Sequence, residues 1–214
     1  MTERSFSIAR GRVVAALVGA GLLLSGCQSG GPTPGTSPSA SNTSASPSAT
    51  PTPTPTPAAT YVPASAKGKA QNVPVPVKPA LADQNSKAGL EAFTKYWFAL
   101  LDYGYQTGDF KYWKTLTKPA CVFCMALHDR VLASYEGGAW LVGGTIQTPK
   151  VTAQWKKETG QQSVAVQVIQ ARTDYYSSAG KMSRASTPES NSGAAFFAVF
   201  ENGAWSVTEM GRLV

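Results

Sequence analysis

Cys121 and Cys124, with two residues between them, are the pair whose spacing most directly suggests chemistry. His128 follows four residues after Cys124 and is the only histidine in the 214-residue chain. On a helix, residues three or four positions apart lie on one face, so these side chains could approach one another. Three interpretations are open: a structural disulfide, a thiol–disulfide active site, and a zinc site with three of its ligands in this segment.

We favour the structural disulfide, because a close cysteine pair in an exported protein is normally oxidised. A thioredoxin-like site requires a strand–helix–strand context, whereas the sequence before Cys121 is helical in pattern. A zinc site lacks an assigned fourth ligand. Haem attachment would require a histidine directly after Cys124, and Met125 stands there. We therefore expect neither a metal nor another cofactor.

Asp102, His128 and Glu209 are the candidates for acid–base catalysis, provided that the fold brings them together. Several aromatic residues could line a ligand pocket beside them: Trp97, Tyr103, Trp113, Tyr135 and Trp205. Aromatic residues at such spacings more often form a core, and the chain contains no nucleophile-elbow, zinc-protease or phosphate-loop motif. We predict a binding or interaction module without catalysis. A hydrolase or isomerase that uses His128 or Asp102 is the alternative, and thiol–disulfide activity of Cys121 and Cys124 is a second one.

The elements that must position these residues begin with an extended run over 61–80, which contains four prolines, and continue with helices over about 85–136. Ser86 is a suitable N-cap, and apolar residues follow it at helical spacing. Gly108 suits the left-handed residue that ends such a helix. Pro119 fits the first position of a further helix, which should stop at Gly137-Gly138.

Strand patterns replace the helical ones over about 139–214. Valines alternate with other residues over 164–168. Asn202-Gly203 predicts a two-residue hairpin turn that places Phe200 opposite Trp205 and Phe196 opposite Glu209. The polar segment 177–192 is predicted to be a long exposed loop. Helices followed by a curved antiparallel sheet of four or more strands define an α+β, cone-like fold.

The N-terminus is predicted to be an export signal, residues 1–26. Three arginines precede an apolar run over 13–24, which is too short to span a bilayer. The run ends in Leu24-Ser25-Gly26-Cys27, which resembles the bacterial lipobox. In that motif, small residues let the peptidase bind the backbone, and a thiolate accepts the lipid. We expect a mature chain that begins at lipidated Cys27 on the outer face of the cell membrane.

Residues 27–60 are predicted to form a disordered stalk. Of the 15 prolines in the chain, eight lie between Pro32 and Pro57, and Ser29 to Thr60 contains no charged or aromatic residue. Such a composition offers little apolar surface to offset the entropy of ordering. The stalk would separate the membrane from a single globular domain over 61–214. Its partner could be a cell-wall polymer, an envelope protein or a small hydrophobic ligand. We expect no nucleic acid, because no basic stripe joins a recognisable module.

Two resemblances extend these expectations. The order of elements over about 84–214 resembles the nuclear-transport-factor-2-like cone, in which a curved sheet wraps a helix around a cavity. A set of motifs resembles an actinobacterial lipoprotein family that carries a domain of unknown function. These motifs are the lipobox, the stalk, Tyr61-x-Pro63, Asn72-Val73-Pro74, Thr107-Gly108-Asp109 and Cys121-x-x-Cys124. The family resemblance implies an envelope location and a disulfide, and it implies no activity.

Overall fold

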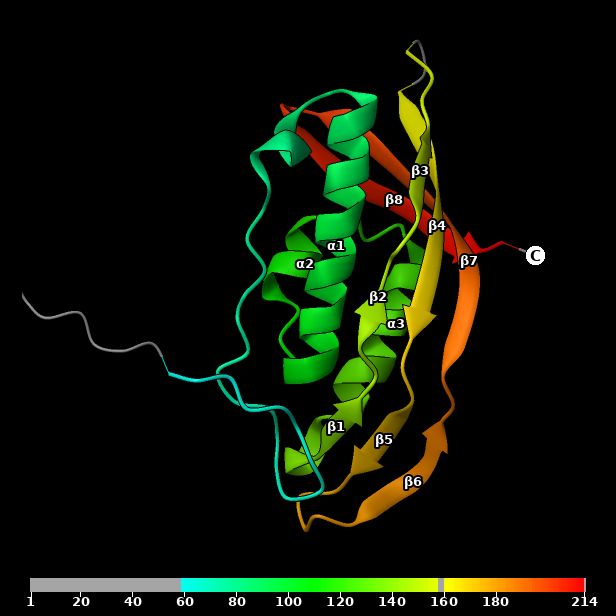
Figure 1. Cartoon of the computed structure of the whole chain (residues 1–214). Coiled ribbons are helices and arrows are strands. Elements are labelled where there is room, and N and C mark those ends of the chain that lie inside the picture. The colour runs from blue at the N-terminus through cyan, green and yellow to red at the C-terminus, as the bar shows by residue number, and fades with distance from the viewer. Residues whose placement is uncertain (1–58, 158–159, 214) are drawn as a thin grey trace, which may run out of the picture. The chain divides into compact units, whose positions relative to one another are not determined.

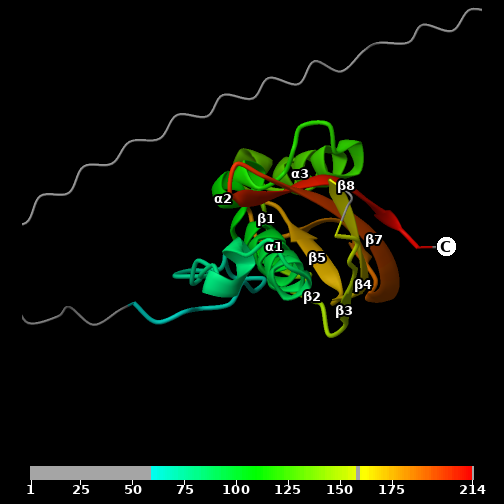
Figure 2. The same ribbon diagram turned by 90° about the horizontal axis from the view of Figure 1, so that it is seen from above.

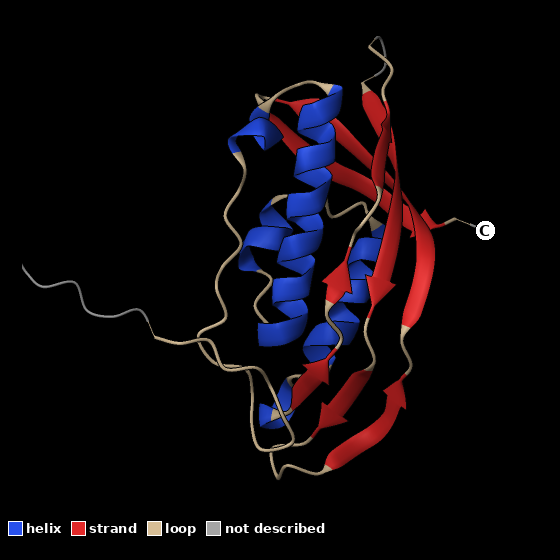
Figure 3. Ribbon diagram, viewed as in Figure 1, coloured by secondary structure: helices blue, strands red, loops and turns tan. Residues whose placement is uncertain are grey.

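The structure is a computed structural model that describes residues 59–157 and 160–213. The predicted signal segment 1–26, the lipidation site Cys27 and the stalk as far as residue 58 lie outside the described residues. Within the described part, helices form one layer and strands the other (Figure 3). No helix in 59–157 or 160–213 has the length and apolar character needed to cross a membrane.

An extended arm, residues 59–79, runs along the domain before the first long helix, as the prolines predicted (Figure 1). Its start folds back on itself through a bridge between Val62 and Gln71. The Trp140 indole Nε1 donates a 2.8 Å hydrogen bond to the Ser65 carbonyl oxygen. The arm ends in a short 3-10 helix, η1 (Ala80–Asp83).

The central helix α1 (Lys87–Thr107) has the ends that the sequence predicted. The Ser86 hydroxyl accepts a 3.0 Å hydrogen bond from the Gly89 amide, which satisfies one unpaired donor of the first turn. Gly108 ends the helix with φ of 76°, in the left-handed region that glycine enters at little cost. The buried face of α1 presents Leu90, Phe93 and Trp97 to the sheet.

Helix α2 (Lys111–Thr115) is followed by α3 (Val122–Ala133) and the short η2 (Glu136–Gly138). The predicted helix start at Pro119 is wrong, because residues 119–120 form a turn and Cys121 is the N-cap of α3. The segment before this turn, residues 116–118, instead pairs with an edge strand of the sheet. There the Val207 amide donates to the Leu116 carbonyl, and the Lys118 amide donates to the Val207 carbonyl, both at 2.8 Å.

The strands form two antiparallel sheets, which confirms the α+β prediction and divides its sheet into two parts. The larger sheet has the order β2-β4-β7-β8, with β3 also pairing β4. Its strands are β2 (Ile146–Gln147), β3 (Val151–Gln154), β4 (Gln161–Gln170), β7 (Ser190–Glu201) and β8 (Ala204–Arg212). The smaller has the order β1-β5-β6, with β1 (Trp140–Gly143), β5 (Thr173–Tyr176) and β6 (Met182–Thr187).

The two sheets are connected by short bends, because β4 of the larger sheet leads into β5 of the smaller one, and β6 leads back into β7. Only residues 171–172 separate β4 from β5, and only 188–189 separate β6 from β7. Across the bend, the Gly144 amide donates to the Arg172 carbonyl and the Ala171 amide to the Thr145 carbonyl, each at 2.9 Å. The predicted loop over 177–192 is therefore wrong: most of it forms β6 and the start of β7, because pairing with β5 and β4 outweighs its weak strand propensity.

The β7–β8 hairpin follows the predicted register only near its turn. Asn202 and Gly203 both have positive φ, and Phe200 faces Trp205 as predicted. A bulge then shifts the register, so that Phe196 faces Met210 and not Glu209. The bulge adds one residue to β8 and turns Glu209 to solvent while Met210 is buried.

Viewed from above, the strands curve around one side of α1 (Figure 2). Helix α1 packs on β1, β2 and β3, and α3 packs on β8. The side chains that fill the space between the layers come from α1, α2, α3 and the inner face of the sheet.

Substitution of Gly89 tests the close packing at the start of α1. An added Cβ would lie 2.1 Å from the Gln84 carbonyl oxygen, a backbone atom that has little freedom to move. We expect Gly89→Ala to lower the free energy of unfolding by about 2 kcal/mol in urea titrations, because overpacking outweighs the gain in helix propensity. The matched control is Gly211→Ala, where no atom lies within 4 Å of the new Cβ. Equal stability of Gly89→Ala and the native chain would contradict this packing.

Candidate functional site

The predicted pocket lies where the cone interior would be, and aromatic side chains fill that space. Trp97 is fully buried, with ring centroids of Trp113 and Phe196 at 5.0 and 5.3 Å. Its Nε1 donates a 2.8 Å hydrogen bond to the Thr117 hydroxyl. Phe93 joins the same cluster between Phe196 and Trp205. The interior between the helices and the sheet is therefore a packed aromatic core.

His128 belongs to this packing. Its ring lies parallel to Trp113, with 5° between the planes and 6.1 Å between the centroids, and the Phe110 ring meets it edge-on at 5.0 Å. The imidazole is buried, and its Nδ1 lies 2.8 Å from the exposed Asp129 carboxylate. This environment suits a packing residue that ties α3 to α2.

Asp102 is half-buried and has a structural partner on each carboxylate oxygen. Oδ1 accepts a 2.7 Å hydrogen bond from the Ile146 amide at the start of β2. Oδ2 accepts one of the same length from Gln106, one turn further along α1. Burial raises the pKa of Asp102, and these two hydrogen bonds oppose the rise. Asp102 thus links α1 to the short strand β2.

The other predicted pocket residues are dispersed. Glu209 is exposed on the outer side of β8, so the structure does not bring it to Asp102 or His128. Trp205 is buried and donates from Nε1 to the Gln84 carbonyl at 3.0 Å. Tyr135 donates its hydroxyl proton to the Tyr105 carbonyl at 2.6 Å, and burial raises its pKa. Tyr103 lies partly exposed on α1, with a pKa also raised by burial.

Cys121 and Cys124 form a disulfide with 5.2 Å between their Cα atoms, as we predicted. Both residues are fully buried at the start of α3. Thiol–disulfide exchange requires a thiolate to reach one sulfur, and this burial blocks that approach. With both sulfurs in the disulfide, neither is a thiolate ligand for zinc. Across 59–157 and 160–213, no three histidine, cysteine or acidic side chains gather in a possible metal site.

A surface pocket of about 360 Å³ lies between the end of α3 and the β5–β6 hairpin. Its lining includes two arginines, Arg130 and Arg184, several serine side chains and one carboxylate, Glu136. We call it the arginine pocket. It is of the size of small-molecule sites, and its charged and hydroxyl-bearing side chains lie among apolar surface.

The Arg184 guanidinium is held in place at this pocket. It lies over the Tyr175 ring, 3.6 Å from the centroid, and donates a 3.0 Å hydrogen bond to the hydroxyl of Ser134, the residue that caps the C-terminus of α3. The Tyr175 hydroxyl in turn lies 2.7 Å from Oγ1 of Thr187. These contacts join the β5–β6 hairpin to α3 and orient the cation.

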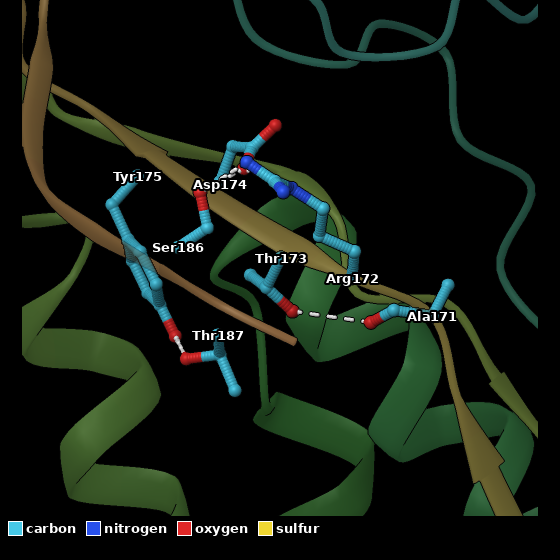
Figure 4. A network of polar contacts seen from close by, with 7 residues as sticks. All are labelled: Ala171, Arg172, Thr173, Asp174, Tyr175, Ser186 and Thr187. Atoms are coloured by element: carbon cyan, nitrogen blue, oxygen red, sulfur yellow. Dashed lines mark hydrogen bonds and ion pairs between the residues drawn. The ribbon is translucent and has the colours of Figure 1, made fainter. Parts of the chain in front are cut away.

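The opposite face of the hairpin carries a second polar network (Figure 4). Asp174 accepts hydrogen bonds from the Ser186 hydroxyl at 2.5 Å and from Nε of Arg172 at 2.9 Å. These two donors lower the pKa of Asp174. In Figure 4 the Tyr175 ring points away from this network, toward the helices. The network therefore joins β5 to β6 where their register shifts, and so supports Tyr175 and Arg184.

A family model described as "Family of unknown function (DUF6318)" matches residues 59–211. This chain belongs to that family. The match spans the extended arm, the helices and the strands described above, so the DUF6318 region includes both the disulfide and the arginine pocket. No curated protein matches the chain.

Several solved structures resemble the DUF6318 chain at low sequence identity. The intermembrane space region of the chloroplast protein ARC6 matches with a TM-score of 0.46 and 9% identity, over 61% of this chain and 98% of that one. Aln2 from a Streptomyces species matches with a TM-score of 0.39 and 12% identity, over 60% and 91%. An uncharacterized Caulobacter vibrioides protein with a cystatin-like fold gives 0.35 and 13%, over 53% and 80%. At these TM-scores the matches establish no shared function.

Sequence reasoning missed the arginine pocket. Arg130 lies on a predicted helix, whereas Tyr175 lies just before, and Arg184 within, the segment 177–192 that the sequence predicted to be a loop. Tyr175-Tyr176, followed by a turn that contains Gly180 with φ of 72°, is a hairpin signal that would have paired these strands. Their approach to Ser134 on α3 depends on the folded chain and has no local signal.

Alkylation tests the state of the cysteine pair. In the folded chain without reductant, we expect neither Cys121 nor Cys124 to react with iodoacetamide, because both sulfurs are in the disulfide. After unfolding and reduction, both should react, as measured by the mass of the tryptic peptide that contains them. Two alkylated thiols in the unreduced chain would contradict the structural disulfide.

Two substitutions of Asp102 test its link between α1 and β2. Asp102→Ala leaves the Ile146 amide unpaired and should lower the free energy of unfolding by about 2 kcal/mol. Asp102→Asn retains an acceptor for that amide, and Gln106 can turn its own amide to accept, so we expect little loss. The two variants serve as matched controls in urea unfolding at neutral pH.

The native chain and Asp102→Asn should also differ in how their stability depends on pH. Because folding raises the pKa of Asp102 above 3.8, the folded state binds this proton more readily than the unfolded state. The stability of the native chain relative to Asp102→Asn should therefore fall as pH rises through the raised pKa. A difference that increases with pH would show that hydrogen bonding, and not burial, dominates at Asp102.

Proposed function

We propose that this DUF6318 chain is an envelope lipoprotein, held at the outer face of the cell membrane by a lipid on Cys27. In this proposal the domain over 61–214 binds its partner through its surface and performs no catalysis. The stalk over 27–60 gives the domain its reach from the membrane.

The filled interior is the observation that carries the non-catalytic part of the proposal. A cone-fold enzyme needs an enclosed space beside its acid or base. Here that space is occupied by Trp97, Phe93 and Phe196, all fully buried. The His128 ring packs on Trp113, and the two Asp102 carboxylate oxygens bind Ile146 and Gln106.

The lipid anchor is supported by the N-terminal sequence. Arginines, an apolar run of suitable length and the motif Leu24-Ser25-Gly26-Cys27 occur in the order that lipoprotein processing requires. A structural disulfide at Cys121–Cys124 also fits an oxidising exterior.

The partner in this proposal is a cell-wall polymer or an envelope protein. A small hydrophobic ligand is disfavoured, because aromatic side chains occupy the interior where it would bind. The full chain has a formal net charge of +7, and removal of residues 1–26 takes away three arginines and one glutamate, so the mature chain carries +5, which favours an anionic partner at the envelope. Nucleic acid is not expected at this location.

Palmitate labelling in cells tests the proposal. Cells that express the full chain are grown with radioactive palmitate, and we expect label in the native chain and none in Cys27→Ser. The Cys121→Ser/Cys124→Ser double variant is the matched control and should retain the label, because it keeps the lipidation cysteine. An unlabelled native chain would contradict the anchor.

Cross-linking of the same cells before lysis tests the binding part. Formaldehyde should shift the palmitate-labelled chain to a complex of higher mass. A labelled chain that stays at its own mass would contradict binding at the envelope while leaving the anchor intact.

A further inference from the structure

We propose that the arginine pocket binds a phosphate group carried by a molecule of sugar or glycerol size. This inference rests on the proposed binding function and names the ligand chemistry of one surface site. It is drawn from the side chains of α3 and the β5–β6 hairpin, which no sequence motif singled out.

The pocket has two cations at its wall and a single carboxylate. Within the described part of the chain, neither Arg130 nor Arg184 forms an ion pair, and Glu136 lies beyond ion-pair distance of both. The local charge of the lining is therefore positive by one unit. Two guanidinium groups without a carboxylate partner favour an anionic ligand, since a charge-assisted hydrogen bond is about twice as strong as a neutral one.

Arg184 is oriented before any ligand arrives. Stacking on Tyr175 and the hydrogen bond to Ser134 use one face and one nitrogen of the guanidinium. Its other donors remain for a ligand, because five N–H groups project from the planar group. A cation that is already held in place loses less side-chain entropy on binding than a free one.

Hydroxyl groups complete a donor set of the kind that phosphate requires. Ser178 and Ser183 line the pocket, and within the described part of the chain neither hydroxyl has a protein hydrogen-bond partner. A phosphate presents three acceptor oxygens in different directions, whereas a carboxylate presents two in one plane. Arg130 comes from α3, whereas Arg184, Ser178 and Ser183 come from the hairpin, and donors on two elements suit a phosphate with oxygens in several directions.

The volume indicates what carries the phosphate. At about 360 Å³ the pocket has room for more than an inorganic phosphate ion and falls within the range of small-ligand sites. Small residues at the lining, Ala133, Gly137 and Ala139, leave this space open. A phospholipid headgroup and a phosphorylated sugar of the envelope both carry a phosphate on a group of this size.

Calorimetric titration of the full chain in detergent tests the site. The probes are glycerol 3-phosphate, which stands for a lipid headgroup, and glucose 1-phosphate, which stands for a phosphorylated sugar. Glycerol and glucose without phosphate are the neutral controls. We expect binding of at least one phosphorylated probe and none of the neutral ones, and the tighter probe identifies the source.

Substitutions separate the pocket from general electrostatic attraction. Arg130→Ala and Arg184→Ala should each raise Kd at least tenfold, because each removes a charge-assisted contact. Lys181→Ala is the matched control: it removes one positive charge from the same hairpin, outside the pocket lining, and should leave Kd within about twofold.

Glu136→Gln should lower Kd, since it removes the one carboxylate from the lining without a change of shape. That gain of affinity would not arise from a folding defect. An equal effect of Lys181→Ala and the arginine variants, or no binding of either phosphorylated probe, would overturn the assignment. Neither result would affect the palmitate and cross-linking tests, which do not involve the pocket.

Discussion

The burial of the Trp97 indole is the interaction on which the rest of this domain depends. One ring contacts the sheet through Phe196 and the second helix through Trp113, and its nitrogen reaches Thr117 in the loop toward α3. The Trp97 side chain therefore contacts the sheet, α2 and the loop toward α3 at the same time. Because an indole buries a large apolar area and also needs a hydrogen-bond partner, its position is strongly specified.

The site that we propose lies on the surface of the domain, beside the β5–β6 hairpin. The bent ribbon of β4–β5 and β6–β7 extends beyond α1, and its smaller sheet meets the end of α3 (Figure 1). There the Asp174 network supports one face of the hairpin while Tyr175 and Arg184 occupy the other. The braced hairpin holds the Arg184 guanidinium in place, which favours the anion binding that we propose for this pocket.

Features with local causes could be predicted from the sequence. Ser86 and Gly108 bound α1 because capping involves only the adjacent turn, and Asn202-Gly203 forms its hairpin because both residues tolerate positive φ. The prediction failed where a neighbouring strand decided the outcome. A bulge in β8 turned Glu209 outward, and pairing with β5 made a strand from a polar segment. The bulge leaves no clear pattern within a few residues of its site, and the β5–β6 hairpin leaves only the Tyr175-Tyr176 run before its Gly180 turn.

By itself, the sequence determined that helices precede an antiparallel sheet, where the central helix begins and ends, and that Cys121 and Cys124 are close enough to pair. Each follows from periodicity, caps or spacing along a short stretch of chain. Only the tertiary structure decided that His128 is a packing residue, that Asp102 binds the start of β2, and that Arg130 and Arg184 share a pocket. These roles arise from contacts between residues far apart in the chain, and such contacts form only when the layers pack.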